Sequence, residues 1–318
     1  ILGFDEVTLA EPRAAAFAVT ASPKADDVAS LLFTSGTTGT PKGVMLSHRN
    51  FTSLLAKLTT VFDMSSRDKL LSVLPLHHTF EFTAGLLMPL VRGAQITYLT
   101  EVSPDALGAA FTEGEITCMI GVPALWQLLH RRVITTIADK GPWAEEIFAA
   151  AVEGARRLRE ATGLNVGKVI FWPVHKKLGG GIRLMVSGGS ALPPDIMKAF
   201  RGLGFSLYEG YGLTEAAPVL AAQRPGSEMV VGSVGEALPG IELKIDQPDA
   251  SGVGEVVARG PNVMLGYYQN PEATAEAIQD GWLHTGDLGR LDEQKRLFLV
   301  GRKKELILAS NGENVYPD

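Results

Sequence analysis

The sequence contains almost no cysteine. Cys118 is the single cysteine among 318 residues, so no internal disulfide and no cysteine-rich metal cluster can form. Apolar residues surround Cys118 on both sides, which predicts a buried strand position. We therefore expect a protein of a reducing, cytoplasmic compartment.

The sequence also lacks an excess of basic residues and a long apolar run. The formal net charge is -6, which argues against broad binding to nucleic acid because that needs concentrated Lys and Arg. The most apolar stretch, residues 86–99, is interrupted by Pro89, Arg92 and Gln95, and a bilayer span needs about 20 apolar residues. No transmembrane segment is expected, and contact with a membrane surface stays open.

The pattern along the chain predicts an α/β protein with more than one unit. Residues 1–232 alternate short apolar strands with amphipathic helices, which is typical of parallel βαβ layers. Residues 233–300 instead show short strands with turns, which indicates a small, barrel-like β-rich subdomain.

Spacing of the apolar residues predicts individual elements in the first unit. Strands are expected over residues 29–34, 70–74, 95–99, 117–122 and 182–186. Helices are expected over residues 51–62, 82–91, 140–164 and 194–201.

Residues 34–43, which read TSGTTGTPKG, carry the densest local signal. Glycines let the backbone turn its N–H groups inward, and the hydroxyls and Lys42 add donors for phosphate oxygens. No Gly-Lys-Ser/Thr triplet occurs, so this is not a Walker loop. We interpret it as a phosphate loop of another class.

Two further segments carry candidate ligand-binding side chains. In residues 208–215, YEGYGLTE, two glycines flank Tyr211 and would let a base stack on its ring. Thr214 offers a hydroxyl and Glu215 a carboxylate that suits Mg²⁺ beside phosphates. In residues 281–287, GWLHTGD, Asp287 is expected in a glycine-bounded turn, where it could accept bonds from ribose hydroxyls.

Together, these segments in this order resemble the adenylate-forming (AMP-binding) superfamily, most of all its long-chain fatty acyl-CoA synthetases. The resemblance runs from the phosphate loop to residues 301–305. It implies that Glu215 holds Mg²⁺, that Lys42, Thr214, Glu215 and His78 are catalytic, and that Lys304 is a hinge residue. The implied nucleotide-binding residues are Thr34, Ser35, Gly36, Thr37, Thr38, Gly39, Lys42, Gly189, Ser190, Ala191, Gly210, Tyr211, Gly212, Thr214, Asp287 and Arg302.

The resemblance also implies the reaction and its partners. A fatty acid carboxylate would attack ATP in the presence of Mg²⁺, releasing pyrophosphate, and coenzyme A would then take the acyl group. Apolar residues that could line an acyl tunnel are Phe82, Leu86, Leu87, Val122 and Trp126. Loading of a carrier protein and a catalytically silent nucleotide- or lipid-binding module remain as alternatives.

The resemblance further implies that this sequence corresponds to a truncated large N-terminal domain. The first part of that domain would be missing, and so would the small C-terminal domain with the lysine that relatives use in adenylation. Residues 1–232 would be the ATP- and acyl-binding region. Residues 301–318 would be a hinge and the start of the missing C-terminal domain, which is expected to belong to the same polypeptide.

Overall fold

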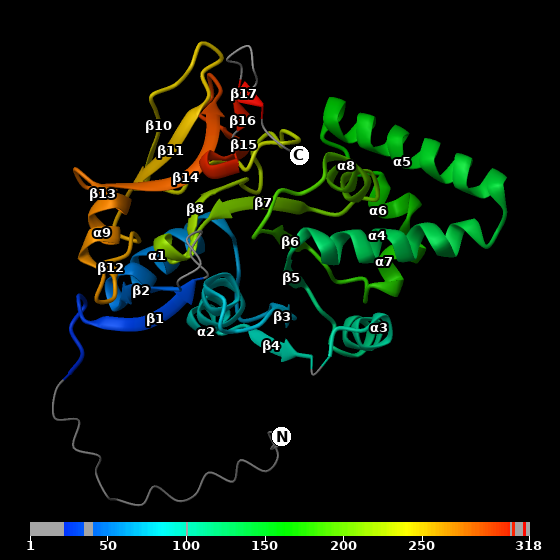
Figure 1. The fold of residues 1–318 in the computed structure, drawn as a ribbon. Coiled ribbons are helices and arrows are strands. Elements are labelled where there is room, and N and C mark those ends of the chain that lie inside the picture. The colour runs from blue at the N-terminus through cyan, green and yellow to red at the C-terminus, as the bar shows by residue number, and fades with distance from the viewer. Residues whose placement is uncertain (1–21, 35–40, 100, 306, 309–313, 316–318) are drawn as a thin grey trace, which may run out of the picture.

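The computed structural model describes residues 22–34, 41–99, 101–305, 307–308 and 314–315. Its largest sheet has seven strands and is mixed, parallel from β4 to β7 and antiparallel from β7 to β9 (Figure 1). The strands, in sheet order, are β4 (Gln95–Tyr98), β3 (Lys69–Ser72), β5 (Cys118–Gly121), β6 (Leu184–Ser187), β7 (Leu207–Gly212), β8 (Val219–Ala222) and β9 (Glu236–Ala237).

Neighbouring residues of the central strands supply two separate hydrophobic cores. Leu70 of β3 and Cys118 of β5 pack into one core, whereas the adjacent Leu71 and Met119 pack into the other. Successive side chains of a strand point to opposite faces of the sheet, so these strands are apolar on both faces. Such near-continuous apolar runs are typical of a sheet that helices cover on both sides.

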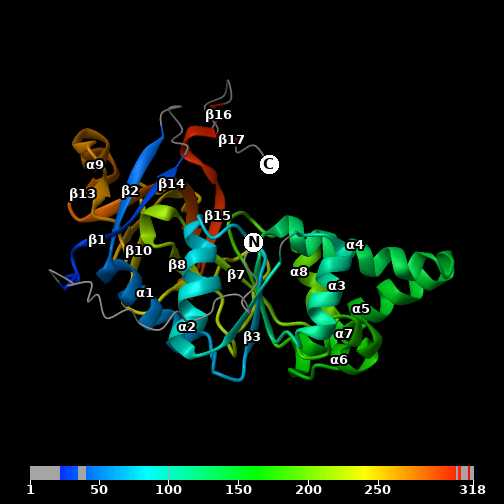
Figure 2. The same cartoon turned by 90° about the horizontal axis from the view of Figure 1, so that it is seen from below.

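Two groups of helices cover the two faces (Figures 1 and 2). The first core receives residues from α1 (His48–Val61) and α2 (Met88–Arg92), and the π-helix η2 (Glu81–Leu87) precedes α2. The second core receives residues from helices on the other face. The helices of that side are α3 (Pro104–Glu113), α4 (Pro123–Ala138), α5 (Pro142–Thr162), α6 (Gly167–Ile170), α7 (Trp172–Lys177) and α8 (Pro194–Gly202).

Three smaller sheets and a short helix complete the described structure. A five-stranded antiparallel sheet contains β10 (Glu242–Asp246), β11 (Gly254–Arg259), β13 (Ile278–Gln279), β14 (Trp282–Leu291) and β15 (Leu297–Arg302). A three-stranded sheet contains β1 (Val28–Thr34), β2 (Lys42–Ser47) and β12 (Gly266–Tyr267). The remaining elements are α9 (Pro271–Ala277) and the pair β16 (Ile307–Leu308) and β17 (Asn314–Val315).

The α/β fold class is confirmed, with one local error and one unresolved boundary. The glycine-bounded turn expected around Asp287 is wrong, because residues 282–291 form the long strand β14. The turn residues occur inside a strand that pairs on both sides, with β11 and with β15. The predicted domain boundaries at 232 and 300 stay a prediction. Two strand pairings cross the first boundary, β9 with β8 and β12 with β2.

Candidate active site

A tight turn connects β7 to β8 and carries Thr214 and Glu215 in the 3₁₀ helix η3 (Thr214–Ala216). A Cβ atom at Gly212 would lie 1.8 Å from the carbonyl oxygen of Pro218, so only glycine permits this close approach. The fully buried amide of Asn262 donates to the carbonyl oxygens of Ala216 and Val219, at 2.7 and 3.1 Å. The turn is therefore held from behind by Asn262, which is not among the residues predicted for the site.

Glu215 and Lys42 are far apart in the chain, and both contact Tyr267. The hydroxyl of Tyr267 donates to Oε1 of Glu215 at 2.7 Å, and Nζ of Lys42 lies 5.0 Å from the centre of the same tyrosine ring. Burial and the Glu215 charge raise the pKa of Tyr267, so the tyrosine remains a donor. Tyr267 therefore connects the phosphate-loop lysine with the expected Mg²⁺ ligand.

The residues at the Glu215 end of the site suit a magnesium ion bound together with phosphates. Among the described residues, no cluster of three or more His, Cys, Asp or Glu side chains could hold a metal ion alone. Mg²⁺ commonly uses one or two carboxylates and completes its coordination with substrate phosphates and waters. Glu215 uses Oε1 to accept the Tyr267 bond, and Oε2 has no hydrogen-bond partner within the described ranges. That oxygen would hold the ion.

Tyr211, Asp287 and Arg302 form a second connected group. The Tyr211 hydroxyl donates to Oδ2 of Asp287 at 2.7 Å, and Nε of Arg302 lies 3.2 Å from Oδ1 of the same carboxylate. Asp287 and Arg302 are register partners on β14 and β15, which is why they meet. The pairing brings together both residues expected at the ribose, and the hydrogen bond holds the Asp287 carboxylate against Tyr211, the residue expected at the adenine.

A buried carboxylate supports this pair of strands. Glu255 on β11 accepts bonds from the Gly286 N–H (3.0 Å) and from Nζ of Lys303 (2.9 Å), and Nδ1 of His284 lies 3.2 Å away. Burial alone would raise the pKa of Glu255, but these partners outweigh burial and lower it. Glu255 thereby anchors both the segment before Asp287 and the residue after Arg302.

The loop after β6 contributes Gly189, Ser190 and Ala191. Gly189 has a φ of 86°, a left-handed conformation that glycine adopts without strain. The N–H of Leu192 donates to Oε1 of the buried Glu209 at 2.9 Å, which ties the loop to β7. Burial raises the pKa of Glu209 to about 7. Gly189 lines the cavity described below, while Ser190 and Ala191 are solvent-exposed beside it.

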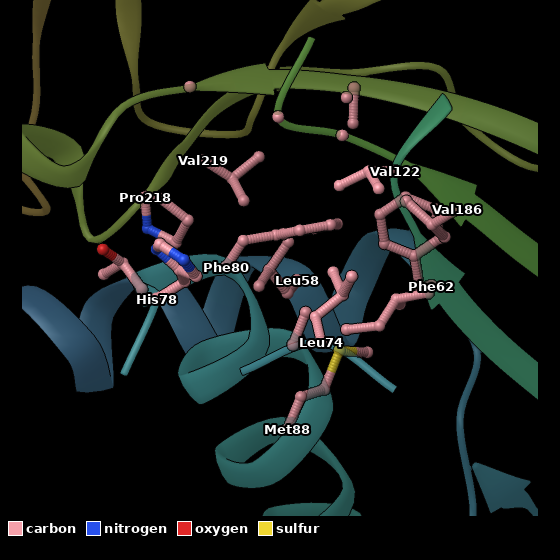
Figure 3. Close-up of a pocket in the computed structure, with 18 of the residues that line it drawn as sticks. Leu58, Phe62, Leu74, His78, Phe80, Met88, Val122, Val186, Pro218 and Val219 are labelled. Carbon is pink, nitrogen blue, oxygen red and sulfur yellow. The ribbon is translucent and has the colours of Figure 1, made fainter. Parts of the chain in front are cut away.

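A cavity of about 500 Å³ connects these residues with an apolar interior (Figure 3). Gly210, Tyr211, Gly212 and Thr214 form part of its wall, and the exposed His78 also lines it. In Figure 3, His78 and Pro218 lie on one side, and Phe62 and Val186 lie on the opposite side. The buried apolar lining residues include Leu58, Phe62, Met64, Leu70, Met88, Cys118, Met119, Ile120, Leu184, Val219 and Ala222.

Most of the residues expected to line an acyl tunnel lie elsewhere. Val122 lines the cavity. Phe82 instead packs edge-on against Phe51, with ring centres 5.5 Å apart, and Trp126 packs against Phe200 at 6.0 Å. Leu86 and Leu87 are partly buried and are not among the lining residues. These four residues do not line this cavity, because periodicity identifies a buried helix face without telling whether it faces a core or a cavity.

A buried glutamate lies immediately behind the cavity wall. Glu81 is fully buried, and the hydroxyl of Ser72 at the end of β3 donates to its Oε1. Its Oε2 atom is buried without a partner among the described residues. Burial raises the pKa of Glu81 to about 7. A Cβ at Gly85 would lie 2.5 Å from Oε1, so glycine one turn later makes room for this carboxylate.

The central part of the predicted phosphate loop lies outside the described residues. This applies to Ser35, Gly36, Thr37, Thr38 and Gly39. The flanking residues Thr34 and Lys42 are register partners of the β1–β2 hairpin, and the Thr34 hydroxyl donates to the Lys42 carbonyl at 3.5 Å. The hairpin therefore brings the two ends of the loop together beside Tyr267.

Comparison with known proteins identifies the family. Residues 3–268 match the model of the AMP-binding enzyme family, so this chain belongs to that family. The long chain acyl-CoA synthetase 7, peroxisomal, of Arabidopsis thaliana is 33% identical over 310 residues, which cover 93% of this chain and 44% of that protein. Feruloyl-CoA synthase from Amycolatopsis sp is 31% identical over 298 residues, which cover 92% and 52%.

A solved structure gives the same architecture. The o-succinylbenzoate coenzyme A synthetase of Bacillus subtilis, in complex with ATP and a magnesium ion, superimposes with a TM-score of 0.72 at 27% identity, covering 93% of this chain and 54% of that one. The adenylate-forming resemblance, with long-chain acyl-CoA synthetases among the relatives, is confirmed. The chain spans about half the length of the relatives it matches.

Proposed function

We propose that this protein activates a medium- or long-chain fatty acid as its acyl adenylate and passes the acyl group to coenzyme A. One observation carries the proposal. A single cavity has Gly210, Tyr211, Gly212 and Thr214 in its wall and extends among buried apolar side chains. A nucleotide held at that strand would place its α-phosphate at the opening of a space suited to an alkyl chain.

The residues of the chain would act mainly by positioning and by charge neutralisation. A carboxylate oxygen of the acid attacks the α-phosphorus, a P–O bond forms, and the bond to pyrophosphate breaks. Lys42 and the Thr214 hydroxyl would offset the charge that develops on phosphate oxygens, and Asp287 would fix the ribose. Magnesium held at Glu215 would supply further positive charge. In the second step a thiolate attacks the acyl carbon, and AMP leaves.

Mass spectrometry of reactions of the full-length protein tests this function. We expect palmitate, ATP and Mg²⁺ to give palmitoyl-AMP, and added coenzyme A to convert it to palmitoyl-CoA. Glu215→Gln should lower adenylate formation at least tenfold, with Glu242→Gln on the exposed β10 as a matched control. Transfer only to a phosphopantetheinyl carrier protein would instead favour the carrier-loading alternative. No adenylate with any acid would favour a silent binding module.

A further inference from the structure

Helices α6 and α7, at the lower right of Figure 2, carry a group of exposed apolar side chains. Val169, Ile170 and Trp172 are 78%, 54% and 50% exposed, respectively, within four consecutive residues. Single exposed apolar residues are common, but a contiguous group usually marks an interaction site. Together with three lysines on the same helices, Lys168, Lys176 and Lys177, we call this the α6–α7 surface.

The residues beneath hold the α6–α7 surface in place. Phe171 is buried and packs edge-on against Phe148, with ring centres 5.2 Å apart. His175 is buried, stacks on Phe205 at 4.0 Å, and its Nε2 donates to the Leu203 carbonyl at 2.9 Å. Because Phe171 and His175 anchor the segment from within, the outward side chains cannot turn into the core. The exposed apolar groups are therefore a fixed feature of the fold.

The charge around this surface is positive in a chain that is acidic overall. Lys168, Lys176 and Lys177 are all solvent-exposed. Residues 161–194 contain no Asp or Glu, although the whole chain carries a net charge of -6. Glu160, just before this stretch, is paired with Arg156 and Arg201. An anionic partner would meet lysines here without facing an opposing carboxylate from the same segment.

We propose that the α6–α7 surface docks the protein onto an anionic lipid bilayer. Valine, isoleucine and a tryptophan would enter the boundary between headgroups and acyl chains, where amphipathic segments and tryptophan are favoured. The lysines would lie at the headgroup phosphates, and each should strengthen binding about fivefold. Exposed aliphatic side chains favour a bilayer over nucleic acid, which offers them no apolar layer. The proposal does not depend on the identity of the acid that is activated.

Cosedimentation of the full-length protein with lipid vesicles tests the proposal. We expect binding to vesicles of phosphatidylcholine with about 30% phosphatidylglycerol, because anionic headgroups attract basic surfaces. We expect little binding to phosphatidylcholine alone or at high salt. Ile170→Asp and the double variant Lys176→Glu/Lys177→Glu should each weaken binding at least tenfold. The tryptophan fluorescence of the protein should shift to the blue on binding, because the ring of Trp172 leaves water.

Matched variants on other elements serve as controls. Leu90 on α2, which covers the other face of the sheet, is 60% exposed, and Lys140 and Lys198 are also exposed. Leu90→Asp and Lys140→Glu/Lys198→Glu should leave vesicle binding unchanged, although they alter hydropathy and net charge equally. Equal losses in test and control variants would overturn the proposal. Absence of vesicle binding by the unmodified protein would also overturn it. If Ile170→Asp then lowered the melting temperature and the control variant did not, this surface would pack against another part of the polypeptide.

Discussion

The Tyr211 hydroxyl and the Asp287 carboxylate form the most specific contact of the candidate nucleotide site. Tyr211→Phe keeps the buried ring but removes the donor to Asp287. A hydrogen bond to a charged group contributes about 1.5–3 kcal/mol, so we expect ATP affinity to fall about tenfold to a hundredfold. Isothermal titration calorimetry of the full-length protein measures the change.

The same experiment needs a control that removes a tyrosine hydroxyl elsewhere. Tyr98→Phe on β4 serves, because Tyr98 is exposed and lies at the far edge of the sheet from β7. ATP affinity should be unchanged in that variant. If Tyr211→Phe also left the affinity unchanged, Asp287 would not depend on the tyrosine for its orientation.

Glu81 makes a prediction about the pH dependence of stability. Its pKa rises from 4.5 to about 7 on folding, so the folded state holds the proton more tightly than the unfolded state. The resulting stabilisation is complete below about pH 4.5 and is lost as the pH rises towards 7, a change of about 3 kcal/mol. In Glu81→Gln, which cannot ionise, the free energy of unfolding should gain about that much relative to wild type between pH 4.5 and 8.

Urea denaturation at the two pH values measures this difference. Glu242→Gln is a suitable control, since the Arg259 hydrogen bond lowers the pKa of the exposed Glu242. Its contribution to stability is present above the unfolded pKa and is lost at lower pH, so this variant should show no such gain. A pH-independent difference for Glu81→Gln would mean that folding does not raise the pKa of Glu81.

At the scale of elements, the cavity wall formed by the end of β6 should limit the length of the acid. Val186 lies across the cavity from His78 in Figure 3. Val186→Phe would fill that end, and each excluded methylene forfeits up to about 0.8 kcal/mol. We expect kcat/KM for palmitate to fall at least tenfold while hexanoate is unaffected. A uniform loss with all acids would mean that the chain does not reach this wall.

The sequence predicted those elements in which apolar residues recur at regular spacing along the chain or fill both faces of a strand. Helix α1 shows this, because its apolar residues recur at helical spacing and Ser47 accepts a bond from the Asn50 N–H as an N-terminal cap. Strands β3, β5 and β6 were predicted within a few residues, since each is apolar on both faces. Local patterns of this kind do not need knowledge of distant contacts.

Features that depend on distant contacts could not be predicted in this way. Residues 281–287 look like a turn, yet two neighbouring strands pair with them and extend β14. Asn262 and Glu209 position the site through buried hydrogen bonds to residues far along the chain. The signal available in the sequence was a glutamate or an asparagine inside an apolar stretch. Only the fold shows which partner each one has.

At the scale of the whole molecule, the connector after β15 should act as a hinge. Lys304 lies in the 3₁₀ helix η4 (Lys303–Glu305), which begins directly after Arg302. Lys304→Pro fixes φ near about -65°, and a hinge must change its backbone angles between two poses. We expect this variant of the full-length protein to retain one half-reaction and lose most of the other. Lys304→Ala should retain both. Equal loss of adenylate and thioester formation in the proline variant would argue against a hinge.

Across the described part of the chain, no helix has both the length and the apolar character needed to cross a bilayer. In one joined site, residues of β7 and η3 meet an apolar cavity. We propose that the energy of burying an alkyl chain drives selection of the acid.

ATP–pyrophosphate exchange by the full-length protein, measured with straight-chain acids from acetate to palmitate, tests this claim most directly. The account predicts that kcat/KM rises by up to about fourfold for each added methylene and levels off once the cavity of about 500 Å³ is filled. A specificity constant that is independent of chain length, or one that is highest for acetate or an amino acid, would contradict it.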